Sequence, residues 1–206
     1  MTTLLDSRGF FYHDPHLYKH AADSQVEEEI RSQCDWIIQQ GAHIDHVDSH
    51  CGTVYGLAGR PFLDPVFRLC AEKKLPFRLP KSPRYLQDMF GEKVPDEATR
   101  LHRQVVETAA ELGIPLLDDM FTSHHAYKDL SGYSELKEFY LRRIQEIGEG
   151  ITELFLHPSY LNEEIAAIFP DWHKRIWEME FLLDDALLKV IEEEDIQLVS
   201  WSTAPW

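Results

Sequence analysis

Basic residues are scarce in this sequence, and their scarcity limits the possible partners. The chain has 20 Lys and Arg against 36 Asp and Glu, which gives a formal net charge of −16. Recognition of phosphate needs Lys and Arg, so this balance argues against nucleic acid as a partner. The acidic runs at 27–29 and 192–195 are typical of solvated helix faces.

Long apolar runs and paired cysteines are also missing. No run approaches the length of a membrane span, and the first eight residues lack the apolar stretch of a signal peptide. The only three cysteines are Cys34, Cys51 and Cys70, and they form no CxxC pair. We therefore expect a cytoplasmic protein with no membrane partner. Cys34 and Cys70 fall on apolar helix positions, and packing is also favoured for Cys51, although it follows His50.

Several catalytic motifs do not occur. There is no GxGxxG, no P-loop and no GxSxG, and the pair His124-His125 has no HExxH context. No Ser or Cys stands in a good nucleophilic constellation. Metal-assisted hydrolysis is left as the leading reaction class.

The residues that are present predict an α/β domain spanning 1–206. Helices are expected from Ser24, with a capping box formed by Ser24 and Glu27, and further at 61–70, 96–112, 134–147 and 172–194. Strands are expected at 43–47, 75–79, 114–117, 151–156 and 196–201. This alternation implies a mostly parallel sheet with helices outside. Five strands are too few to close a barrel comfortably, since the usual barrel has eight.

Polar or aromatic side chains stand at or just after the carboxyl ends of these strands. In chain order they are His46, Asp48, His50, Arg78, Asp118, Asp119, His157 and Trp201. The carboxyl ends of parallel strands face the same way, so we expect these groups to converge.

His50 is the strongest candidate for a metal ligand. A neutral imidazole binds a divalent metal through one nitrogen, while a carboxylate such as Asp48 or Asp45 fixes the other. A continuing strand would place His46, Asp48 and His50 on one face. For His43 and His46, packing or hydrogen bonding is the more common role.

His157 and Arg78 are the other main candidates. Pro158 restrains the backbone of His157, which makes this side chain a plausible general acid or base, although it could simply cap a strand. Arg78 would present a fixed fork of donors to a substrate oxygen or a catalytic carboxylate, and an ordinary salt bridge is an equal alternative.

Five segments resemble motifs of the YdjC-like carbohydrate deacetylases, the ChbG/HpnK group. Residues 46–50 (HVDSH) resemble hxDSH, and residues 75–80 (LPFRLP) match P-x-R-x-P. Residues 152–158 (TELFLHP) match TELMxHPG, with Ser159 where glycine is common. Residues 175–182 fit an RxxE…L helix, and 196–201 fit the last strand. The resemblance runs the length of the chain.

This resemblance implies a TIM-like (β/α) barrel of the polysaccharide-deacetylase-like type, incomplete here, and often oligomeric. Its activity removes N-acetyl groups from amino sugars or small oligosaccharides with the help of a divalent metal, Mg or Zn. The assigned residues are the metal ligand His50, the catalytic residues His157, Asp48 and Arg78, and the substrate-binding residues Glu178 and Trp201.

Two family motifs do not occur in these 206 residues: an Asp-Asp-x-G strand end and a G-x-H-x-T strand. Residues 4–11 (LLDSRGFF) resemble the loop that follows the second of them. We therefore expect the first two strand units to be missing, and metal binding and activity to be weak or absent.

Two alternatives remain. The chain could be a non-catalytic binding or assembly relative whose exposed sheet edges are covered in a homo-oligomer. It could also be a different barrel hydrolase that takes its metal ligands from His46, Asp48, His50 and His124.

Overall fold

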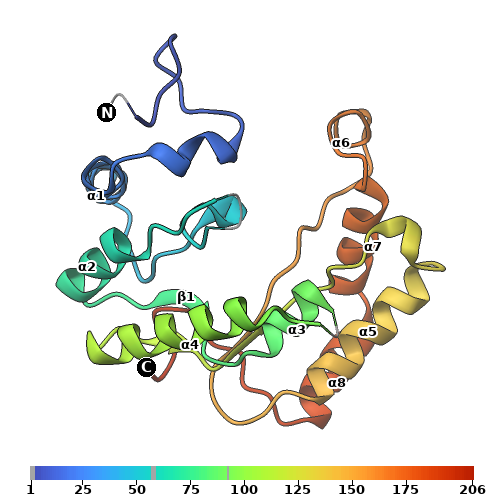
Figure 1. Ribbon diagram of the computed structural model, residues 1–206. Helices are drawn as coiled ribbons and strands as arrows, with labels where there is room; N and C mark the ends of the chain where they lie inside the picture. The colour runs from blue at the N-terminus through green and yellow to red at the C-terminus, as the bar shows by residue number, and fades with distance from the viewer. Residues whose placement is uncertain (1–2, 57–58, 92) are drawn as a thin grey trace. The chain divides into compact units, whose positions relative to one another are not determined.

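The computed structural model describes residues 3–56, 59–91 and 93–206. The side chains of Pro15 and Cys51 lie outside this description, and with them the predicted packing of Cys51. By contacts the chain divides into two compact units. The first unit comprises Met1–Leu79, Arg100–Leu116 and Trp201–Trp206, and the second comprises Pro80–Thr99 and Leu117–Ser200. Figure 1 labels helices and strands of both units.

The first unit contains the N-terminal helices. Its elements are η1 (Pro15–His20), α1 (Asp23–Gln39), η2 (His50–Gly52), α2 (Leu63–Lys73), most of β1 (Phe77–Pro80), the part of α4 (Asp96–Glu111) from Arg100 onward, and the start of β2 (Leu116–Leu117). Its core consists of apolar side chains, namely Val47, Val66, Phe67, Cys70, Phe77, Ala109, Ile114 and Leu116. Cys34 and Cys70 are both buried and unpaired, which confirms their predicted packing role.

Helix α1 begins at Asp23, and the predicted capping box is not formed. The residue before the helix is Ala22, which has no side-chain cap. Its N–H instead donates to Thr3 Oγ1 at 3.1 Å. A side chain that is distant in sequence therefore meets the N-terminal end of the helix, and Ser24 lies inside the first turn.

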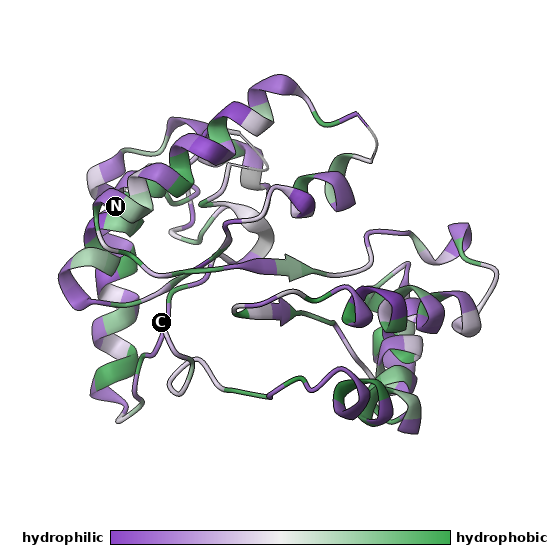
Figure 2. Cartoon of the chain, turned by 90° about the horizontal axis from the view of Figure 1, so that it is seen from below, coloured by the Kyte–Doolittle hydropathy of each residue, from purple (hydrophilic) through white to green (hydrophobic). Residues whose placement is uncertain are grey.

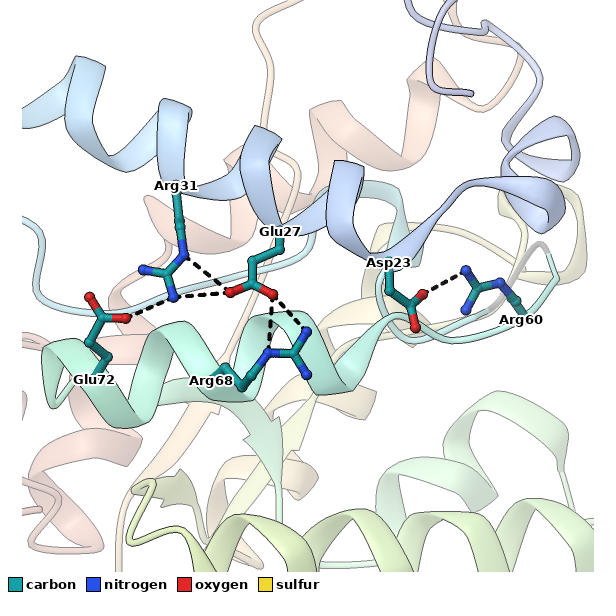
Figure 3. A network of polar contacts seen from close by, with 6 residues as sticks. All are labelled: Asp23, Glu27, Arg31, Arg60, Arg68 and Glu72. Carbon is teal, nitrogen blue, oxygen red and sulfur yellow. Dashed lines mark hydrogen bonds and ion pairs between the residues drawn. The ribbon is translucent and has the colours of Figure 1, made fainter. Parts of the chain in front are cut away.

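Glu27, the acid of that predicted box, ties α1 to α2 instead. Its carboxylate accepts hydrogen bonds from Arg31 at 3.1 Å and from Arg68 at 2.7 Å. Arg31 also reaches Glu72 at 2.7 Å. Figure 3 shows these contacts among Glu27, Arg31, Arg68 and Glu72, together with the separate ion pair of Asp23 and Arg60.

The second unit contains one parallel strand pair with helices around it. Its elements are α3 (Arg84–Phe90), β3 (Asp119–Phe121), η3 (Tyr127–Asp129), α5 (Tyr133–Gln145), β4 (Thr152–Leu154), α6 (Glu163–Ile168), α7 (Trp172–Leu182) and α8 (Asp185–Glu193). Strands β3 and β4 pair in parallel, with Phe121 opposite Leu154. The core gathers residues of α5, α7 and α8 on this pair; its buried members are Phe121, Leu136, Tyr140, Ile144, Phe181 and Val190.

The mixed α/β class and the predicted helices are confirmed, and α3, α6 and β3 are additions to the prediction. The helices carry hydrophilic and hydrophobic residues together, as Figure 2 shows, so each can bury one side. Among the described residues, no helix is both long and apolar enough to cross a bilayer.

Two predicted strands are wrong. In 43–47 only Val47 pairs, through a parallel bridge to Phe77. In 196–201, all of which is described, no residue lies in a strand. An apolar segment becomes a strand only where a neighbour supplies a continuous ladder of hydrogen bonds, and in 43–47 that ladder is limited to the bridge at Val47. The strands in the described residues form two-stranded sheets, β1–β2 and β3–β4, so a TIM-like barrel is not confirmed.

Candidate functional site

Asp48 and Arg78 are brought together in the first unit by the parallel bridge between Val47 and Phe77. Val47 N–H donates to Pro76 O at 3.0 Å, and Arg78 N–H donates to Val47 O at 2.9 Å. Arg78 Nη1 then lies 3.3 Å from Asp48 Oδ1 and 3.4 Å from Oδ2. Tyr55 adds a third contact, because its hydroxyl lies 3.3 Å from Asp48 Oδ1 and is shared with the Arg78 carbonyl, which is the nearer acceptor.

This ion pair is only partly withdrawn from water. The Asp48 side chain is 35% exposed and that of Arg78 is 15% exposed. The arrangement places a fixed guanidinium beside a carboxylate, which is the geometry expected for either a catalytic pair or a salt bridge. The catalytic roles of both residues remain predictions.

His50 lies in the short turn η2, and its side chain is exposed. Ser49, just before it, is buried, and its Oγ accepts the N–H of Val54 at 2.9 Å. His50 and Asp48 both line a cavity of about 260 Å³ within the first unit. Its other polar and aromatic lining residues include Phe11, Tyr18, Glu29, Gln33 and Thr53.

His46 and Trp201 contact each other in the first unit. Their rings stack with centroids 4.2 Å apart at 9°. His46 Nδ1 lies 2.7 Å from Asp45 Oδ1, and Trp201 stacks on Trp206 at 5.0 Å. His46 thus has the packing and hydrogen-bonding role left open by the sequence. Substrate contact by Trp201 remains a prediction.

The described residues do not by themselves fit the divalent metal that the sequence resemblance implies. Among them, no three His, Cys, Asp or Glu side chains lie close enough to share an ion. Asp48 is already bound by Arg78 and Tyr55. A divalent site needs more ligands than His50 and one engaged carboxylate supply. The alternative set with His124 joins residues of different units.

Glu178 and His157 are brought together in the second unit. Glu178 is 2% exposed, and its Oε2 accepts the His157 N–H at 2.7 Å. Its Oε1 accepts the Tyr140 hydroxyl at 2.9 Å. Two further contacts hold the same segment, because Arg175 Nη1 lies 3.4 Å from His157 O and Ser159 N–H donates to Arg175 O at 3.1 Å. Substrate contact by the buried Glu178 carboxylate remains a prediction.

Lys174, Tyr140 and Ser123 complete this cluster and were not predicted from the sequence. Lys174 Nζ lies 3.9 Å from Glu178 Oε1 and donates to the Ser123 carbonyl. Ser123 N–H donates to the Tyr140 hydroxyl at 3.3 Å. Burial lowers the pKa of Lys174, although the Glu178 charge opposes this shift. The one available signal was the spacing of four between Lys174 and Glu178, which puts both on one helix face.

The other polar candidates in the second unit have local partners. Asp118 accepts the Ile151 N–H at 2.8 Å and pairs with Lys81 at 2.6 Å. Desolvation raises the pKa of Asp118, but the contacts with Lys81 and Ile151 outweigh it, so that the pKa is lowered overall. Desolvation and the nearby Lys174 ammonium lower the pKa of His124, whose ring meets Tyr85 edge-on at 5.6 Å. This shift favours a neutral imidazole.

Known proteins match this chain along almost its whole length. The family model for YdjC-like protein matches residues 1–193. A carbohydrate deacetylase of Thermoanaerobacter pseudethanolicus is 26% identical over 203 residues, which cover 98% of this chain and 69% of that protein. One of Brevibacillus brevis is 25% identical over 202 residues, covering 97% and 69%.

A solved structure shares the fold. It is the crystal structure of a proposed cellobiose-phosphate cleavage protein of Enterococcus faecalis V583, with a TM-score of 0.70 and 20% sequence identity. The match covers 98% of this chain and 69% of that one. The chain therefore has the fold of that solved protein.

Proposed function

Because the chain belongs to the YdjC-like family, we propose that it is a hydrolase that removes N-acetyl groups from amino sugars or small oligosaccharides. The observation that carries the proposal is the family match over residues 1–193. Relatives that are 24–26% identical bear the name carbohydrate deacetylase, which supports the reaction class. We also propose the incomplete TIM-like barrel, which the shared fold supports.

The residues of this chain have distinct parts in the proposed reaction. His157 protonates the leaving amine as general acid, from a backbone held on both its N–H and C=O. Asp48 and Arg78 form a polar pair at the cavity that also contains His50. The cavity, about 260 Å³, suits a small substrate with hydroxyl groups, because carboxylate, amide and hydroxyl side chains line it.

His50 is the proposed ligand for a divalent ion, Mg or Zn. The described residues do not complete a site for that ion. The 206 residues contain neither the Asp-Asp-x-G nor the G-x-H-x-T motif, so we propose weak metal binding and slow turnover for these residues alone.

The test measures acetate and free amine released from N-acetylglucosamine oligomers, with and without added Zn²⁺ or Mg²⁺. We expect slow release of both in equal amounts, lost in His157→Asn and in Asp48→Asn but kept in the control Asp35→Asn, whose side chain is 63% exposed. Oligomer binding without acetate release would identify a non-catalytic relative. A protein that neither binds the oligomers nor releases acetate from them would overturn the proposal.

A further inference from the structure

Helix α7 holds two loops that follow the paired strands of the second unit. Phe121 and Leu154 are partners in the β3–β4 register. Ser123 follows the first of these residues by two positions, and His157 follows the second by three. Both loops therefore leave neighbouring strands at the same end of the pair, where parallel strands place functional side chains.

The main-chain polar groups of both residues are held. At Ser123, the N–H donates to the Tyr140 hydroxyl at 3.3 Å and the carbonyl accepts from Lys174. At His157, the N–H donates to Glu178 at 2.7 Å and the carbonyl lies 3.4 Å from Arg175 Nη1. Glu178 links the two loops, because its other oxygen accepts the Tyr140 hydroxyl at 2.9 Å.

The charges in this cluster depend on one another. The side chain of Glu178 is 2% exposed and that of Lys174 is 16% exposed, so neither charge is well solvated alone. A buried charge that loses its partner is strongly destabilised. The Lys174 ammonium, 3.9 Å from Glu178 Oε1, therefore offsets part of the cost of burying the carboxylate, and hydrogen bonds to charged acceptors are stronger than those between neutral groups.

We infer that Lys174 and Glu178 are positioning residues: together with Tyr140 they fix the main chain at Ser123 and His157 and thereby set the His157 imidazole for catalysis. This inference rests on the proposed deacetylation for its purpose, but the clamp itself can be measured without turnover. Buried supporting contacts of this kind determine how precisely a catalytic side chain is held.

The experiment is a double-mutant cycle with Lys174→Met, Glu178→Gln and the pair. The matched control is Lys189→Met, Glu193→Gln and their pair, because Lys189 and Glu193 have the same spacing on α8 at 3.6 Å but side chains 71% and 57% exposed. The measurement is amide hydrogen exchange at His157 and Ser159, with Ile144 in α5 as the reference for opening of the unit.

We expect His157 to exchange about tenfold faster or more in Lys174→Met and in Glu178→Gln, with Ile144 changed less. The double variant should accelerate exchange at His157 by less than the two single changes combined, since it leaves no unpaired buried charge. The control variants should leave the His157 rate unchanged. Equal rates in test and control variants, or parallel acceleration at Ile144, would overturn the inference. If Glu178→Gln does not fold, Lys174→Met decides by the same criteria.

Kinetics separate this inference from the proposed function. In a chain that releases acetate, Lys174→Met should lower kcat at unchanged KM, because positioning acts after binding. An unchanged kcat would refute the positioning role. A chain that shows the exchange pattern but never releases acetate would refute the proposed function and leave the clamp intact.

Discussion

The two loops that bear the strongest histidine candidates are built in different ways. In the first unit, His50 is exposed in a short turn, and the nearby Asp48 is 35% exposed beside Arg78. In the second unit, His157 is anchored through its main chain to Glu178, which is 2% exposed. The first loop offers its side chains to a cavity, whereas the second is fixed from inside the protein.

This difference separates recognition from positioning. Exposed polar groups retain the freedom to bind a ligand, and changing them costs little stability. A buried carboxylate with two donors is costly to disturb, since its partners would be left without hydrogen bonds. Substitutions should therefore reduce stability in the second loop and reduce ligand binding in the first.

The largest effect on stability is expected from removing the Tyr140 hydroxyl, which supports the loops at Ser123 and His157. Tyr140→Phe removes the hydroxyl that donates to Glu178 and accepts from Ser123. The lost hydrogen bonds in a buried cluster should lower the free energy of unfolding by about 1–3 kcal/mol. Tyr160→Phe is the matched control, because Tyr160 is 68% exposed and its variant should differ by less than about 0.5 kcal/mol. Urea denaturation measures both, and equal midpoints would remove the contrast between the loops.

A smaller effect on stability is expected from substituting His50, which is exposed in η2. His50→Asn should change the free energy of unfolding by less than about 0.5 kcal/mol, since the side chain is exposed. The same change should weaken any binding of Zn²⁺, while His43→Asn, another exposed position, should not. Calorimetric titration of each variant with ZnCl₂ checks this. Equal Zn²⁺ affinity in the two variants would remove His50 as a ligand.

The smallest effect is expected at the α1–α2 network of Figure 3. Hydrogen bonds from Arg68 and Arg31 lower the pKa of Glu27. A lowered carboxylate pKa contributes stability above the pKa of the unfolded chain, and this contribution is lost as pH falls through the folded pKa. Glu27→Gln should thus lower the melting temperature slightly at pH 7 and less at pH 3, with the difference reduced in 1 M NaCl. A difference that grows in acid would contradict this sign.

The helices could be predicted from the sequence because their signals are local. The stripe of α1 and the end of α5 before Gly148 follow from periodicity and from glycine as a stop. The strands at 43–47 and 196–201 could not be judged in this way. Both segments contain β-branched and other apolar residues that suit a strand, but a strand also needs a partner at hydrogen-bonding distance, which the local pattern does not reveal.

The candidate site was predictable to the same extent. A contact of Arg78 with a carboxylate followed from the sequence as one of the roles left open for it, although Arg78 is the second residue of β1 and not its end. The contact between the Glu178 carboxylate and His157 did not follow from the sequence. Glu178 is 21 residues away from His157 in the chain, and Tyr140 lies on a different helix, α5. Lys174 was missed since a lysine is ordinarily solvated, and only the fold shows that this one is mostly buried.

The most direct test of the contrast between the loops is amide exchange at His50 and His157 in the same unmodified protein. We predict that the His157 amide, bound to Glu178 at 2.7 Å, exchanges about a hundredfold more slowly than the His50 amide after correction for intrinsic rates. Equal protection of the two amides would contradict the account.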